Sequence, residues 1–288
     1  VASGVLRVAA GNLYAGIADA TTLNFTTTQP IELSAIAAGT GGFVVNGQCA
    51  FDNSGNSVAS AGDVNGDGLG DLIVGAQFSD PAALSAAGRS YVVFGKTATS
   101  AIDLSAIAAG TGGFVINGQG ERDYSGFSVA GAGDVNGDGL SDLIVGAYRS
   151  GSTAGRSYVV FGKTATAAIN LSAIAAGTGG FVINGQCAND YSGRSVAGAG
   201  DVNGDGLGDL IVGANRSDPA AGHYAGRSYV VFGKTATAAI NLSAIAAGTG
   251  GFVINGQGAG DWSGISVASA GDVNGDGLSD LAVGASRS

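Results

Sequence analysis

The stretch DVNGDGLSDLIVGA, residues 134–147, places an aspartate-rich loop directly before the apolar run Leu-Ile-Val-Gly-Ala. Asn-Gly and Asp-Gly pairs are strong signals of hairpin turns, and short apolar runs that end at glycine are typical of buried strands. Near-copies of the loop begin at Asp63, Asp201 and Asp272, so that successive loops are 71, 67 and 71 residues apart. The sequence is therefore a tandem repeat, and one repeated unit must build the fold.

Each repeat contains four segments of strand length, which in the second repeat are residues 126–130, 143–147, 155–162 and 180–185. The second and third segments are rich in β-branched and aromatic residues, as expected for strands that are buried on both faces. A four-stranded sheet cannot bury both faces alone, so neighbouring copies must stack, either radially as a β-propeller or as an open solenoid. We predict an all-β protein, a β-propeller with four blades of four antiparallel strands each.

The repeats cover residues 33–288, and residues 1–32 are expected to form an irregular N-terminal segment. Within that segment, Thr22 to Phe25 is a candidate strand that would complete the blade begun by the last loop and close a four-bladed ring. Otherwise the chain is a slice of a longer propeller or array. The recurring Leu-Ser-Ala-Ile-Ala-Ala segments fit a short helical turn or a strand. Loops one and three, like loops two and four, are 138 residues apart, which indicates duplication of a two-repeat unit.

The loop places side-chain oxygens at positions 1, 3, 5 and 9 and a backbone carbonyl at position 7. Calcium prefers six to eight hard oxygen ligands, and glycine at position 6 permits the sharp turn of such loops. A plain polar turn is the simpler interpretation, but three neighbouring carboxylates are unfavourable without a cation. We therefore predict about four Ca²⁺ ions, one per repeat, with these ligands: Asp63, Asn65, Asp67, Leu69, Asp71, Asp134, Asn136, Asp138, Leu140, Asp142, Asp201, Asn203, Asp205, Leu207, Asp209, Asp272, Asn274, Asp276, Leu278 and Asp280.

The charge balance agrees with this interpretation, because 12 of the 22 acidic residues lie in the four loops. Four Ca²⁺ ions would offset most of the formal net charge of −10. The 12 Lys and Arg residues are spread evenly along the chain, which argues against nucleic-acid binding. No apolar stretch is long enough to span a membrane. One histidine and no recurring Cys/His pair leave no set of catalytic residues, so an enzyme is not expected.

Cys49 and Cys187 occupy the same position in repeats one and three. Free thiols or cross-links between molecules are expected there, because bridged Cα atoms must lie within about 7 Å of each other. A small buried residue in place of glycine is the alternative. His223, the single histidine, is expected to be a surface-loop residue without a partner.

An aromatic residue precedes Ser-Gly in three repeats, at Tyr124, Tyr191 and Trp262. Packing between blades is the expected role of these rings, and a rim that binds a glycan or a protein is the alternative. The arginines that precede the Tyr-Val-Val-Phe segments are expected to make surface or turn contacts: Arg89, Arg156 and Arg227.

Two further motifs recur with the loops: Tyr-Val-Val-Phe-Gly at residues 91–95, 158–162 and 229–233, and Val-Gly-Ala beginning at residues 74, 145, 212 and 283. Together with the four loops, they resemble the FG-GAP repeats of the integrin α-subunit propeller and of bacterial calcium-binding surface proteins. The resemblance covers about residues 33 to 288. It implies a β-propeller with calcium in hairpin loops on one face and partners on the opposite face. The residue after each Gly-Ala pair departs from the proline of the family pattern: Gln77, Tyr148, Asn215 and Ser286.

The expected function is a non-enzymatic extracellular or cell-surface module that serves adhesion or binds a protein or glycan on a propeller face. The alternative is a structural repeat of an extracellular filament, sheath or matrix, in which copies of the chain associate. An accessory domain of a larger enzyme is a third interpretation. The chain is also expected to be a processed or excised piece of a longer protein.

Overall fold

A computed structural model describes residues 32–288, so the candidate strand from Thr22 to Phe25 lies outside the described residues. Contacts divide the chain into two units, one of Val1–Val44 with Thr99–Ala101 and one of Val45–Ala98 with Ile102–Ser288. The described part of the first unit contains α1 (Leu33–Ala37). All other helices and strands belong to the second unit, which carries the four repeats.

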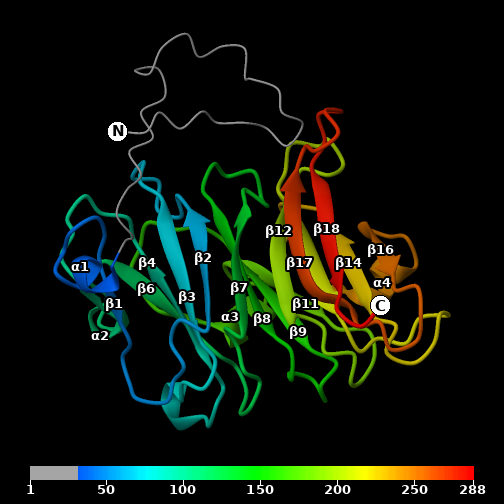
Figure 1. Ribbon diagram of the computed structural model, residues 1–288, viewed down its shortest axis with the longest axis horizontal. Helices are drawn as coiled ribbons and strands as arrows, with labels where there is room; N and C mark the ends of the chain where they lie inside the picture. The colour runs from blue at the N-terminus through cyan, green and yellow to red at the C-terminus, as the bar shows by residue number, and fades with distance from the viewer. Residues whose placement is uncertain (1–31) are drawn as a thin grey trace, which may run out of the picture. The chain divides into compact units, whose positions relative to one another are not determined.

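The second unit is built from antiparallel sheets, one per repeat, that we call blades 1 to 4 (Figure 1). Blades 1 to 3 each have four antiparallel strands, and blade 4 has two in the described residues. Their bounds are β2 (Ser57–Gly62), β3 (Asp71–Ala76), β4 (Arg89–Val93) and β6 (Gly113–Asn117) in blade 1; β7 (Ser128–Gly133), β8 (Asp142–Ala147), β9 (Arg156–Val160) and β11 (Gly180–Asn184) in blade 2; β12 (Ser195–Gly200), β13 (Asp209–Ala214), β14 (Arg227–Val231) and β16 (Gly251–Asn255) in blade 3; β17 (Ser263–Gly271) and β18 (Asp280–Ala285) in blade 4.

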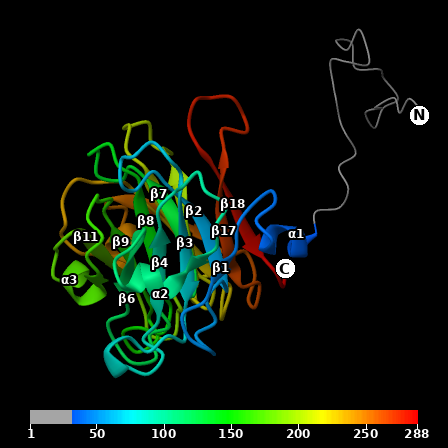
Figure 2. The ribbon, with the colours of Figure 1, turned by 90° about the vertical axis from the view of Figure 1, so that its left-hand side faces the viewer.

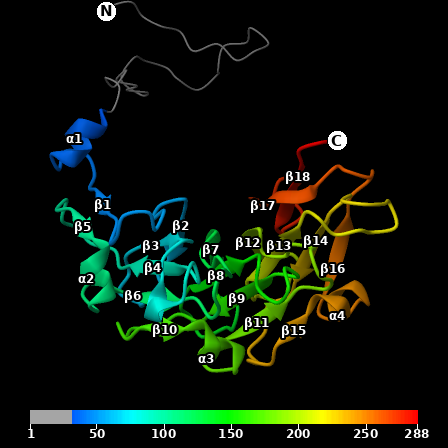
Figure 3. The same ribbon diagram turned by 90° about the horizontal axis from the view of Figure 1, so that it is seen from below.

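The four strand-length segments of the repeat therefore form strands in the predicted order, and the all-β, propeller-type fold is confirmed. The first strands of successive blades, β2, β7, β12 and β17, lie next to one another. Seen from below, the four blades follow one another along an arc (Figure 3).

The Leu-Ser-Ala-Ile-Ala segments, which the sequence left undecided, are helical: α2 (Leu104–Ala108), α3 (Leu171–Ala175) and α4 (Leu242–Ala246) in this unit. A strand of two residues precedes each helix: β5 (Ile102–Asp103), β10 (Ile169–Asn170) and β15 (Ile240–Asn241). These short strands pair in parallel with the preceding outer strand: β5 with β1 (Val45–Asn46), β10 with β6 and β15 with β11. Each repeat thus lends a strand to the outer edge of the one before it. Figure 2 shows α2 beside the strands of blade 1. A single 3₁₀ turn, η1 (Pro81–Ala83), follows β3.

Apolar residues from facing blades form continuous cores, which is why the second strands can be buried on both faces. Between blades 1 and 2, residues such as Ile73, Val92 and Phe114 pack on Leu143 and Val145 of the next blade. The same positions one repeat later form the core between blades 2 and 3. Burial of apolar side chains on this scale stabilises the stack by about 1.5 to 3 kcal/mol for each fully buried large side chain.

In blades 1 to 3, the glycine of the Gly-Ala pair is required by the close approach of the next blade. A Cβ atom on Gly146 would lie 2.1 Å from the carbonyl oxygen of Gly193, and one on Gly213 would lie 2.1 Å from that of Gly264. No side chain fits at such a distance, so only glycine lets the blades meet here.

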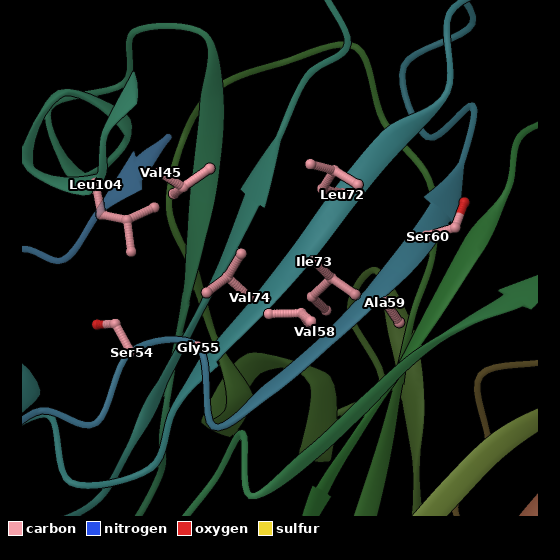
Figure 4. A pocket seen from close by; sticks show the side chains of 10 residues that line it. All are labelled: Val45, Ser54, Gly55, Val58, Ala59, Ser60, Leu72, Ile73, Val74 and Leu104. Atoms are coloured by element: carbon pink, nitrogen blue, oxygen red, sulfur yellow. The ribbon is translucent and has the colours of Figure 1, made fainter. Parts of the chain in front are cut away.

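Blade 1 has no described blade before it, so a residue that is buried in blades 2 and 3 is exposed on that face of blade 1. Val58 is 65% exposed, whereas Val129 and Val196, its counterparts in blades 2 and 3, are each 4% exposed. A cavity of about 460 Å³ lies on this face, lined by residues that include Val58, Leu72 and Val74 together with Leu104 of α2 (Figure 4). In blades 2 and 3 the same face is filled by the preceding blade.

Candidate metal-binding loops

The four aspartate loops connect the first and second strands of each blade, so they all lie at one end of the blades, the upper end in Figure 1. They comprise residues 63–71, 134–142, 201–209 and 272–280. The structure therefore gathers the predicted ligands into one loop per blade on a common side. The loops of blades 2 and 3 border a cavity of about 330 Å³ that Asp134 and Asp201 help to line.

The aspartate at position 1 organises the backbone of its loop. In the first repeat, Asp63 Oδ1 accepts hydrogen bonds from the N–H groups of Gly66 (2.7 Å) and Asp67 (3.1 Å), and Oδ2 accepts one from Gly68 (2.9 Å). Gly66 and Gly68 have φ values of +77° and +84°, which glycine adopts without strain. The same three bonds recur at Asp134, Asp201 and Asp272.

These bonds favour the ionised carboxylate. The N–H of Gly206 is the main cause of a lowered pKa at Asp201, with further contributions from the N–H groups of the same turn. The N–H groups of the loop therefore already surround a carboxylate that carries a negative charge, without a cation.

Positions 3 and 5 contact each other through their side chains. Asn65 Nδ2 donates to Asp67 Oδ2 at 2.9 Å, and Asp67 Oδ1 accepts from the N–H of Leu69 at 2.8 Å. The corresponding amide-to-carboxylate bond is present in the second and third loops. In the described chain, no N–H group donates to the position-7 carbonyl oxygens, which belong to Leu69, Leu140, Leu207 and Leu278.

The aspartate at position 9 has a structural role that the sequence did not indicate. Asp142 is fully buried, and its carboxylate accepts hydrogen bonds from the N–H groups of Val135 (2.9 Å) and Gly162 (2.8 Å). It therefore joins the loop and the start of β8 to the end of β9. Asp71 and Asp209 make the same pair of bonds. Each carboxylate oxygen has a second lone pair that these bonds leave available.

Burial raises the pKa of the position-9 aspartates of the first three loops, because the charged form loses its hydration. For Asp142 the pKa rises to about 7, with the N–H groups of Gly162 and Val135 acting in the opposite direction. Asp71 and Asp209 are raised for the same reason.

A pH dependence of stability follows from these raised pKa values. A carboxyl whose folded pKa lies above its unfolded pKa stabilises the fold fully below the unfolded value and loses this contribution as pH rises through the folded value. In EGTA, the free energy of unfolding should therefore fall by a few kcal/mol between pH 5 and pH 8, since one pKa unit corresponds to about 1.4 kcal/mol. Urea unfolding across this range measures the slope. Asp142→Asn should reduce it and Asp276→Asn should not; equal slopes would contradict the assignment.

Each of the first three loops is also bonded to the next blade. The N–H of Ser141 donates to the carbonyl of Asp63 (2.9 Å), and the N–H of Lys163 donates to that of Val64 (2.8 Å). The equivalent bonds link the loop of blade 2 to blade 3 through Gly208 and Lys234, and Ser279 of blade 4 donates to Asp201 of blade 3. The conformation of a loop is thus coupled to the junction between blades.

The loops fit calcium in donor chemistry and in backbone turn. Each supplies three carboxylates, an amide oxygen and an unbonded carbonyl, which are the hard oxygens that Ca²⁺ prefers. Within residues 32–288, however, no three Asp, Glu, His or Cys side chains converge closely enough to share a metal ion. The buried position-9 carboxylates are bonded to backbone N–H groups, while the carboxylates at positions 1 and 5 remain at the loop surface.

A partly buried polar cluster in blades 1 and 3 was missed by the sequence interpretation. Arg89 donates from Nε to Asn117 Oδ1 (2.9 Å) and from Nη1 to Gln48 Oε1 (2.9 Å), and Gln48 Oε1 also accepts from Tyr91 Oη (2.6 Å). Blade 3 repeats all three bonds around Arg227. The expected repeated contact is thus present at Arg89 and Arg227, but the sequence did not indicate that a glutamine 41 residues upstream is the partner. The recurrence of Asn-Gly-Gln was the available signal.

The cysteines and the histidine lie on the surface. Cys49 and Cys187 are exposed and not joined to each other, so the alternative of a buried residue was wrong, and cross-links between molecules stay a prediction. His223 is exposed as expected, but it has partners: Nδ1 lies 3.0 Å from Asp218 Oδ2, and the ring stacks on Tyr224 at 3.7 Å.

Comparison with known proteins agrees with the repeat unit and its strands. A family model described as "FG-GAP repeat" matches residues 54–93, 125–160, 192–231 and 263–288. The chain is 38% identical over 116 residues to integrin alpha pat-2 of Caenorhabditis briggsae, which is 38% of this chain and 8% of that protein. It is 34% identical over 168 residues to integrin alpha-PS2 of Drosophila melanogaster, 56% of this chain and 10% of that protein. The chain thus matches about a tenth or less of these relatives.

Among residues 32–288, no helix is long and apolar enough to cross a membrane.

Proposed function

Because the chain consists of FG-GAP repeats arranged as propeller blades, we propose that it is a non-enzymatic, calcium-dependent adhesion module that binds a protein partner outside the cell. The similarity to integrin α subunits supports an adhesion-type propeller and a place at the cell surface. A glycan partner is the second form that the same module would take.

The observation that carries this proposal is the bonding of the first three aspartate loops to the blade that follows each of them. The carbonyl groups of Asp63 and Val64, inside the first loop, accept N–H groups from blade 2. A Ca²⁺ ion held by such a loop would fix the backbone that joins two blades, and extracellular calcium near millimolar occupies even sites with a Kd of about 10⁻⁴ to 10⁻³ M. The ion would supply charge neutralisation and rigidity. The side chains of Asp63, Asn65, Asp67 and Asp71, with the Leu69 carbonyl, would hold it.

The test is calcium-dependent capture on arrays of purified extracellular-matrix proteins and of glycans. Beads coated with the protein should be retained on protein spots in calcium and released by EGTA. The matched control replaces the exposed position-5 aspartates, whose bonds stay within the loop, with alanine: Asp67, Asp138, Asp205 and Asp276. This variant should fold and lose retention. Absence of retention, or retention that persists in EGTA, would contradict an adhesion role, and retention on glycan spots alone would assign the second form.

A further inference from the structure

Arginine side chains stack on aromatic rings at the end of the blades opposite the aspartate loops, the lower end in Figure 1. Arg149, Arg216 and Arg287 each follow the second strand of a blade, at the same position of the repeat. The guanidinium carbon lies 5.0 Å from the ring centre of Tyr124 for Arg149, 4.3 Å from that of Tyr191 for Arg216 and 3.5 Å from that of Trp262 for Arg287. We call these three residues the arginine row.

The aromatic ring beneath each arginine is held in an unfavourable backbone conformation. Tyr124, Tyr191 and Trp262 have φ values of +54°, +57° and +57°, a region that bulky residues rarely adopt. Such strain persists only where the surrounding structure enforces it, and it is concentrated at functional positions. The three rings are half-buried. Tyr124 and Tyr191 contact Phe78 and Tyr148 of the preceding blade, so the expected packing between blades is present, and one side of each ring is left for the arginine.

The first repeat provides an internal comparison. There, Asn53 occupies the strained position with a φ of +53°, and Asn adopts this region more readily than an aromatic residue does. The arginine position of the same repeat is Phe78. The stacked arginine and its aromatic partner therefore occur together in repeats two, three and four and are both missing from the first repeat, which indicates that the two side chains act as a pair.

The guanidinium groups of the arginine row have free hydrogen-bond donors. Within the described chain, the contacts of these side chains are the stacking contacts, and no carboxylate lies within ion-pair distance of them. Nearby carboxylates are bonded elsewhere: Asp218 to His223 and the N–H of Tyr224, Asp190 to the N–H of Cys187, and Asp261 to the N–H of Gly258. Arg149 and Arg287 are exposed and Arg216 is half-exposed. A stacked guanidinium presents its N–H edge outward, in the geometry that binds a carboxylate with two hydrogen bonds.

We infer that the arginine row binds an extended acidic segment of a protein partner. Packed sheets lie about 10 Å apart, and three residues of an extended chain also span about 10 Å, so carboxylates at every third residue match the row. Tyr, Trp and Arg are the residues that dominate binding energy at protein interfaces. This inference deepens the proposed function by naming the chemistry of its partner, and it rests on that proposal.

The test measures binding of a short fluorescein-labelled peptide that repeats Glu-Ser-Ser to the whole chain in calcium. The fluorescence anisotropy of the peptide at low ionic strength gives the Kd. The Glu-Ser-Ser peptide should bind, and a Gln-Ser-Ser peptide should not. Arg216→Gln should weaken binding about tenfold, as expected for loss of a charge-assisted hydrogen-bond pair. Arg216→Lys should restore only part of the affinity, because lysine keeps the charge but lacks the planar fork.

The matched control is Arg122→Gln, which removes one exposed arginine at the same end of the blades that stacks on no ring. It should change the Kd less than about twofold, as expected for an exposed charge whose contribution is small. Circular dichroism establishes that each variant is folded. Equal losses in Arg122→Gln and Arg216→Gln, no binding of the Glu-Ser-Ser peptide, or preferential binding of heparin would overturn the inference. In any of these cases, capture of coated beads on matrix proteins would leave the proposed function standing.

Discussion

Chelation of calcium with EGTA is expected to lower the melting temperature of the protein by about 10 °C or more relative to a sample in about 10 mM calcium. A ligand that binds only the folded state stabilises it by mass action, and a site exposed to about ten to a hundred times its Kd gains about 1.4 to 2.7 kcal/mol. Four such loops act on one stack of blades. In a chain of this size one kcal/mol shifts the melting temperature by about 2 °C or more.

Two controls make this measurement specific. Magnesium at the same concentration should stabilise much less, because it requires near-octahedral geometry and retains its water ligands. Replacement of the position-5 aspartates Asp67, Asp138, Asp205 and Asp276 with alanine should remove most of the calcium effect while leaving the EGTA melting temperature nearly unchanged. If the wild-type chain melts at the same temperature in calcium and in EGTA, the loops are polar turns and do not bind calcium at these concentrations.

Asp142→Ala is expected to reduce the free energy of unfolding by about 2 to 4 kcal/mol even in EGTA. The substitution removes the acceptor of the buried N–H group of Val135 and of the partly buried N–H group of Gly162, and an unpaired buried donor costs about 1 to 3 kcal/mol. Urea denaturation measured at constant pH gives the difference. The effect is independent of metal, because the carboxylate joins three backbone segments within blade 2.

Two matched variants separate this structural role from metal binding. Asp280 is the same residue of the fourth loop but is partly exposed, and its bonds go to Val273 and Asn274 within the loop, so Asp280→Ala should cost less than about 1 kcal/mol. Asp138→Ala, at an exposed position of the same loop as Asp142, should also cost little in EGTA. Equal destabilisation by all three substitutions would show that the buried bonds of Asp142 contribute nothing particular.

The strand order and the stacking of blades could be predicted because each repeat presents the same β-branched runs at the same spacing. Leu143, Ile144 and Val145 form a strand that is buried on both faces, as an uninterrupted apolar run indicates. The helices could not be predicted, since a five-residue Leu-Ser-Ala-Ile-Ala segment is too short for its periodicity to distinguish a helical turn from a strand.

The loop residues could be identified from their spacing, but the two roles of the aspartates could not. Position 1 and position 9 look alike in the sequence, yet Asp63 collects N–H groups of its own turn, whereas Asp71 reaches Gly95, which lies 24 residues further along the chain. The partnership of Arg89 with Gln48 depends in the same way on neighbours that only the folded chain brings together. Burial, which raises the pKa of Asp71, is likewise a property of the assembled blade.

The repeated residue positions on the blade faces allow whole repeats to be inserted or deleted during evolution. Blade 2 meets blade 1 through the same residue positions that blade 3 uses to meet blade 2. An unequal recombination event that inserts or deletes whole repeats therefore creates no new junction, because every blade already fits any neighbour. The number of repeats can therefore change without a loss of stability at the junction. Residues at the end opposite the aspartate loops, such as Phe78 and its counterpart Arg149, differ between repeats and can set what each chain recognises.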